Sequence, residues 1–65
     1  MEFNTRLTNL LKEQNLTSNM LAKLIKVNNK KVKGWESGDK LPNLFELVEL
    51  CKVFNCSSDY LLGVE

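Results

Sequence analysis

Residues 16–38, LTSNMLAKLIKVNNKKVKGWESG, hold two short amphipathic helix patterns separated by a break of a few residues. Thr17 precedes the first pattern and Asn28 precedes the second, and both residue types cap helix N-termini well. We therefore predict helices over 18–25 and 29–37, with a glycine ending the second. Two helices joined by so short a connection must cross sharply, which is the arrangement of a helix-turn-helix.

The charge of this stretch differs from that of the rest of the chain. Between Glu13 and Glu36 there are five lysines and no acidic residue, which gives +5. The remainder has four basic and eight acidic residues, or −4, and the two parts add to the net charge of +1. A charge run is usually a solvated helix surface, and lysine content alone leaves that interpretation open. All the acidic residues lie in other parts of the chain. This distribution favours the interpretation that the stretch forms a surface for an anionic partner such as DNA.

Helical geometry assigns the faces of the 29–37 helix. At about 100° per residue, Val32 and Trp35 lie close together around the helix and are predicted to face the core. The opposite face then carries Asn29, Lys30, Lys33 and Gly34. Lysine can donate to guanine and asparagine can pair with adenine in the major groove. This helix is thus predicted to enter a DNA major groove, with Lys31 beside the core face in a flanking or phosphate-binding role.

Helix patterns also lie on both sides of the central stretch. Apolar spacing predicts a first helix over 3–14, a fourth over 44–54 that is capped by Asn43, and a short last helix over 58–62. The expected buried stripe of the second helix is Leu21, Leu24 and Ile25. That of the fourth helix is Leu44, Leu47, Val48, Cys51 and Phe54. No strand pattern, repeat or linker is visible, so the prediction is one compact all-α domain over 1–65.

Composition limits the kinds of function. With 65 residues, no histidine and no convergent set of titratable groups, the chain offers little for an enzyme or a metal site. Cys51 and Cys56 match no common zinc spacing and are expected to pack as small apolar residues. No signal peptide or membrane-spanning run is apparent, so a cytoplasmic protein without cofactor or small-molecule ligand is expected.

Taken with their spacing, many of these residues resemble the phage repressor and Cro family of helix-turn-helix domains, also called the Xre family. The resemblance covers almost the whole chain and rests on Leu16-Thr17, Leu21-Ala22, Leu24, Val27, Val32, Trp35-Glu36, Gly38, Pro42, Leu44, Leu47 and residues 57–63, SSDYLLG. It implies a lambda-repressor-like five-helix bundle that binds specific double-stranded DNA to regulate transcription. It also implies a repressor that acts on a palindromic operator as a weak homodimer.

The resemblance assigns roles to individual residues. Base reading falls to Asn29, Lys30, Lys33 and Gly34. Phosphate contacts are expected from Ser18, Asn19, Lys26, Asn28, Lys31 and Lys40.

Four positions depart from the family pattern. Ser18 replaces a longer glutamine, Lys26 stands where the turn commonly has glycine, and Gly34 has no side chain to read a base. Leu11 replaces an arginine that often pairs with the glutamate at position 36, so Glu36 needs another partner. Ser18 and Gly34 keep open an alternative, a protein-interaction module that retains the fold without binding DNA, although the uninterrupted basic segment argues against it.

Overall fold

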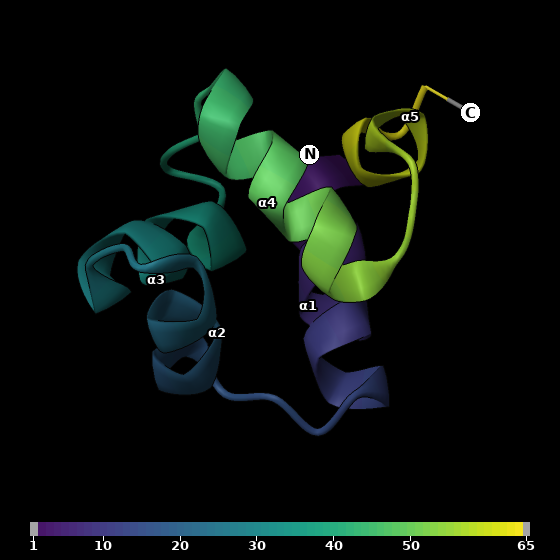
Figure 1. Ribbon diagram of the computed structural model, residues 1–65. Coiled ribbons are helices and arrows are strands. Elements are labelled where there is room, and N and C mark those ends of the chain that lie inside the picture. The colour runs from purple at the N-terminus through teal and green to yellow at the C-terminus, as the bar shows by residue number, and fades with distance from the viewer. Residues whose placement is uncertain (1, 65) are drawn as a thin grey trace.

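Five helices make up the structure, a computed structural model that describes residues 2–64. They are α1 (Glu2–Glu13), α2 (Ser18–Ile25), α3 (Asn29–Ser37), α4 (Leu44–Phe54) and α5 (Ser58–Leu62) (Figure 1). The predicted helices are confirmed, except that the first lies one residue earlier than 3–14. The ends of the predicted 1–65 domain lie outside the described residues. None of the helices in residues 2–64 is long and apolar enough to cross a membrane.

Each helix after α1 begins at a side-chain cap. Thr17, Asn28, Asn43 and Ser57 accept hydrogen bonds from backbone amides of the turns that follow them. Each such cap contributes about 1 kcal/mol of stability, because the first amides of a helix have no partner within it. The caps depend on residues only two or three positions away, which is why the helix starts were predictable.

The helix C-termini share another local feature, which is a residue with a positive φ angle. Asn15, Lys26 and Asn55 adopt φ between 52° and 59°, and Gly38 and Gly63 also have positive values. After α1, α2 and α4, the next residue donates its amide to a carbonyl five positions back, as in Val27 to Ala22 at 3.0 Å. In each case that residue is apolar and packs against the core. Each of these turns therefore ends its helix and places the following apolar residue against the core.

The core is assembled from one face of every helix. Its fully buried members include Phe3, Leu7, Leu21, Val32, Trp35, Leu50 and Leu61. α1 contacts both α3 and α5, while α2 contacts α3 and α4. Figure 1 shows α2 and α3 together on one side of the molecule, with α5 on the other. Both cysteines are free and half-buried against this core, as expected for apolar packing.

The predicted buried faces of α4 and α2 need correction. Leu44 is 71% exposed and Val48 44% exposed, whereas Leu50, outside the predicted stripe, is completely buried. Leu24 of α2 is also exposed, at 57%. α4 is apolar around most of its circumference, so spacing alone allows more than one stripe. Packing against the other helices buries Leu50 and Phe54 and leaves an apolar outer face.

Candidate nucleic-acid interface

The turn between α2 and α3 brings the two helices together as a helix-turn-helix. Lys26 adopts the left-handed conformation, with φ 59° and ψ 47°, and its amide donates to Ala22. A residue other than glycine costs about 1 kcal/mol in this conformation. Asn28 then caps α3 by accepting from the Lys30 amide at 2.8 Å. Lys26 and Asn28 are both exposed at this turn.

Two anchors set the rotation of α3 about its axis. Val32 and Trp35 are 0% and 1% exposed, which confirms them as core residues. Their burial turns Lys30 and Lys33 outward, and both lysines are exposed. The face opposite the core therefore carries two ammonium groups with no acidic side chain between them in the sequence.

Asn29, at the edge of this face, is only half-exposed. Its Oδ1 atom is buried and has no hydrogen-bond partner within residues 2–64. A buried acceptor without a partner is costly, by about 1–3 kcal/mol. To accept from a base, the amide would have to rotate outward, and doing so would also relieve this cost.

Gly34 lies under the side chain of Lys40. A Cβ atom added at Gly34 would lie 3.2 Å from both Cγ and Cδ of Lys40. The Lys40 amide also donates to the Gly34 carbonyl oxygen at 3.1 Å. The missing side chain thus makes room for the loop after α3 and brings Lys40 beside the predicted reading face. The sequence placed Gly34 among the base-reading positions but without a side chain for readout, and its contact with Lys40, six residues away, was not predicted.

The N-terminus of α2 carries an unexpected contact. Ser18 Oγ donates to Glu36 Oε2 at 2.5 Å, so Ser18 is the partner that Glu36 lacked in the sequence. The two residues line a hollow of about 430 Å³ together with Thr8, Lys33 and Ser37. The Ser18 hydroxyl proton is therefore engaged by a carboxylate in the free protein. Asn19 is exposed beside it, and the first amides of α2 point out of the helix end.

Ser37 belongs to this surface and was missed by sequence reasoning. It follows Lys33 by four residues and Lys30 by seven, which places it on the same helical face. Its hydroxyl donates to the Gly34 carbonyl oxygen at 3.1 Å. The helical spacing could have identified it.

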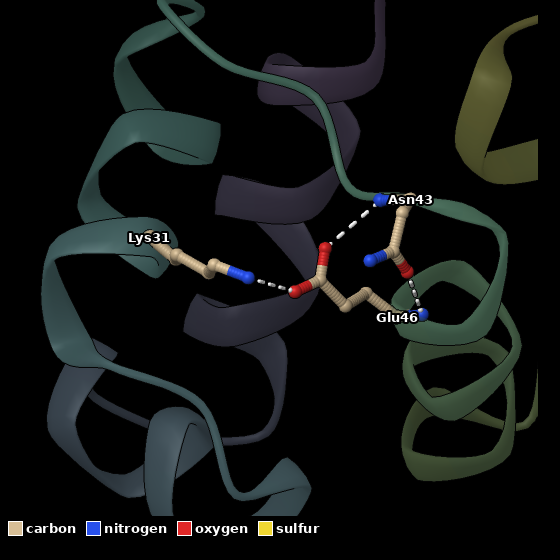
Figure 2. Close-up of polar contacts among 3 residues, drawn as sticks. All are labelled: Lys31, Asn43 and Glu46. Carbon is tan, nitrogen blue, oxygen red and sulfur yellow. Dashed lines mark hydrogen bonds and ion pairs between the residues drawn. The ribbon is translucent and has the colours of Figure 1, made fainter.

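Lys31 lies against α4, as Figure 2 shows. Its Nζ is 2.6 Å from Glu46 Oε2, and the other oxygen of Glu46 accepts from the Asn43 amide at 2.8 Å. Asn43 Oδ1 in turn accepts from the Glu46 amide at 2.8 Å. Burial disfavours the charged carboxylate, but the bonds from Lys31 and Asn43 outweigh it and lower the pKa of Glu46. Lys31 thus ties α3 to the start of α4.

The described residues offer little else for ligand chemistry. Within residues 2–64 there is no group of three or more acidic, cysteine or histidine side chains that could hold a metal ion.

Comparisons with known proteins agree on the arrangement just described. A helix-turn-helix family model matches residues 7–61. The HTH-type transcriptional activator BcrR of Enterococcus faecalis is 38% identical over 65 residues, which are 100% of this chain and 32% of that protein. A crystal structure of a transcriptional regulator from Listeria innocua superposes with a TM-score of 0.88 at 33% identity, over 94% of this chain and 57% of that one. The chain thus spans about a third and a little over half of the lengths of these relatives.

Proposed function

Because this chain belongs to the Xre and Cro type of helix-turn-helix family, whose members are DNA-binding regulators of transcription, we propose that it reads a specific DNA sequence with α3 in the major groove. One observation carries the proposal. Burial of Val32 and Trp35 turns Lys30 and Lys33 outward, and the chain has no acidic residue from position 14 to position 35. Such a face suits the acceptors of the groove and the phosphates around it.

We assign base reading to the exposed side of α3. Lys30 and Lys33 would donate to guanine, and Asn29 would pair with adenine after rotating outward. Gly34 would contribute by letting the α3 backbone and the Lys40 side chain approach the duplex together. This role replaces side-chain readout at that position.

Phosphate contacts are assigned to the edges of the same surface. The first turn of α2, with Ser18 and Asn19, offers backbone amides and a partly positive helix end. Lys26 and Asn28, at the turn between α2 and α3, and Lys40, in the loop after α3, are exposed. Lys31 is the weakest member of this group, since its ammonium already pairs with Glu46. Phosphate contacts of this kind would set the register of α3 on the duplex.

We further propose that residues 1–65 act as one DNA-binding domain in the cytoplasm and bind a palindromic operator as a weak homodimer. Two α3 helices about 34 Å apart would then read half-sites one helical turn apart. Repression is the proposed effect on transcription, because a protein bound to an operator that overlaps a promoter blocks access to that promoter.

A salt series tests DNA binding directly. Affinity for random-sequence duplex, measured by fluorescence anisotropy, should fall steeply from low to physiological salt as counterions return to the phosphates. A flat dependence would contradict the proposal. It would favour the second candidate, a protein-interaction module, which the Ser18–Glu36 bond supports because it places a carboxylate at the proposed phosphate site.

Sites selected from a random duplex pool would then define the operator. Transcription from a promoter overlapping the selected site should decrease when the protein is added, and an increase would contradict repression.

A further inference from the structure

The two cysteines of the chain meet at the C-terminus of α4. Cys51 lies in the last turn of the helix, and Cys56 is the second residue after its end. The Cys56 amide donates to the Cys51 carbonyl oxygen at 3.1 Å, across the left-handed residue Asn55. At helix ends of this type the side chains at these two positions frequently pack together. The backbone therefore directs the two cysteine side chains toward each other.

The two thiol groups are in contact, and one of them is open to reagents in solution. The Cys56 thiol hydrogen-bonds with the Cys51 thiol. Both residues are free and half-buried. Cys51 also lines a surface hollow of about 460 Å³ beside α4. A small thiol reagent can therefore reach the Cys51 sulfur without unfolding of the chain.

The surroundings of the two thiols assign them different roles. Burial and the neighbouring Cys51 thiol raise the pKa of Cys56 above its ordinary value, so Cys56 stays protonated at neutral pH. Exchange with a disulfide requires a thiolate and access to it. Cys51, which lines the hollow, is thus the thiol suited to attack first. Cys56, in contact with it, is placed to resolve the product.

We propose that Cys51 and Cys56 form a reversible intrachain disulfide when the protein meets a low-molecular-weight disulfide such as oxidised glutathione. Cys51 loses its proton and attacks one sulfur of that reagent, which gives a mixed disulfide and releases one glutathione thiol carrying a proton. Cys56 then loses its proton and attacks the Cys51 sulfur, which displaces the second glutathione as a thiol. The two protein thiols lose two electrons and two protons, and the reagent disulfide takes up both.

Such a bridge would respond to oxidation rather than hold the fold permanently. In the proposed cytoplasmic location thiols are kept reduced, so the disulfide forms only while the oxidised reagent accumulates. The bridge closes a loop that contains the buried core residue Phe54, at the junction of α4 and α5. It would stabilise this junction and protect Cys51 from irreversible oxidation. The inference does not depend on the proposed function, because neither cysteine belongs to the proposed DNA surface.

The test follows oxidation of the reduced 65-residue chain in a series of buffers with different ratios of reduced to oxidised glutathione. After acid quenching, the remaining thiols are alkylated and the intact mass identifies each product. Wild type should lose both alkylation sites together without retaining glutathione, and excess reduced glutathione should restore both sites.

Single variants test the order of attack. Cys56→Ser should stop at a mixed disulfide between Cys51 and glutathione. Cys51→Ser should form its mixed disulfide at least about tenfold more slowly, because Cys56 is less accessible and more strongly protonated. Circular dichroism should show native helix content in both variants, and the corresponding alanine variants replace either one that is unfolded.

A repetition in urea shows whether the fold promotes the bond. Since native contact holds the two thiols together, the equilibrium constant for closing the disulfide should be about tenfold higher in the folded than in the unfolded chain. The oxidised chain should accordingly unfold at a higher urea concentration than the reduced chain. Any of four results would overturn the inference: thiols that stay free in the most oxidising buffer, mixed disulfides that persist in wild type, a disulfide between two copies, or equal closing constants with and without urea.

Discussion

At the scale of single residues, Glu36 is the group that most alters the expected interface. Its carboxylate accepts the Ser18 hydroxyl at the N-terminus of α2 and shares a hollow with Lys33. An anion is favoured at a helix N-terminus, so Glu36 occupies part of the environment that suits a phosphate. The structure therefore places an internal competitor beside a proposed DNA contact.

Replacing this carboxylate by an amide should strengthen DNA binding. Glu36→Gln keeps an acceptor for Ser18 but removes the negative charge, so affinity for any duplex should rise by about fivefold at low salt. Glu13→Gln, which removes an acid at the exposed end of α1, is the control and should change affinity less. Anisotropy titrations with random duplex measure both. A lower affinity for Glu36→Gln would instead show that the ionised carboxylate positions Ser18 for binding.

Truncation of Lys30 and truncation of Lys40 should affect DNA affinity in different ways. Lys30→Ala removes a proposed base contact and should lower affinity for the selected duplex by about tenfold or more while sparing random duplex. Lys40→Ala removes a proposed phosphate contact and should weaken both duplexes alike, with a salt slope smaller by about 1. Equal losses on both duplexes for Lys30→Ala would exclude base reading by that residue.

At the scale of helices, an ion pair between Lys31 and Glu46 links α3 to the first turn of α4. Glu46 has a pKa below its ordinary value of 4.5, because Lys31 and the Asn43 amide bind its charged form. Only 12% of the Glu46 side chain is exposed. A lowered carboxyl pKa contributes stability above the unfolded value, and that contribution is lost as pH falls through the folded pKa.

Glu46→Gln should therefore destabilise the protein in a pH-dependent manner. At pH 7 we expect a loss of about 1 kcal/mol in the free energy of unfolding, measured with urea. The difference from wild type should shrink as pH falls through the lowered pKa of Glu46, because the wild-type carboxyl is then uncharged as well. Glu49→Gln changes an exposed, longer ion pair and should cost less than about 0.5 kcal/mol at either pH. A constant difference across pH would show that the charge of Glu46 is not what stabilises the contact.

At the scale of the whole molecule, the proposed DNA-binding residues lie on α2, on α3 and in the loop that carries Lys40, and a homodimer of the proposed kind would hold two such surfaces. Two such copies would impose a fixed distance between half-sites.

The spacing of half-sites should thus matter as much as their sequence. Inserting about five base pairs between two selected half-sites turns one of them to the opposite side of the duplex. Affinity for the paired sites should then fall to about that for a single site, as measured by band-shift titration. Unchanged binding after the insertion would contradict a rigid dimer on the operator.

The sequence by itself determined where the helices begin and end. Thr17, Asn28 and Asn43 cap their helices through residues two or three positions away, and Lys26 ends α2 through a carbonyl four positions back. These interactions are local, so they can be recognised in the sequence without knowledge of the fold. The burial of Val32 and Trp35, and hence the outward side of α3, followed from helical spacing for the same reason.

Only the tertiary structure decided which groups meet across helices. Ser18 lies 18 residues from Glu36, and Lys31 lies 15 from Glu46, so neither pairing could be read from local spacing. The buried side of α4 was likewise undetermined, because a helix that is apolar nearly all round can turn several faces inward. Packing against the other helices buries Leu50 and leaves Leu44, Phe45 and Val48 exposed.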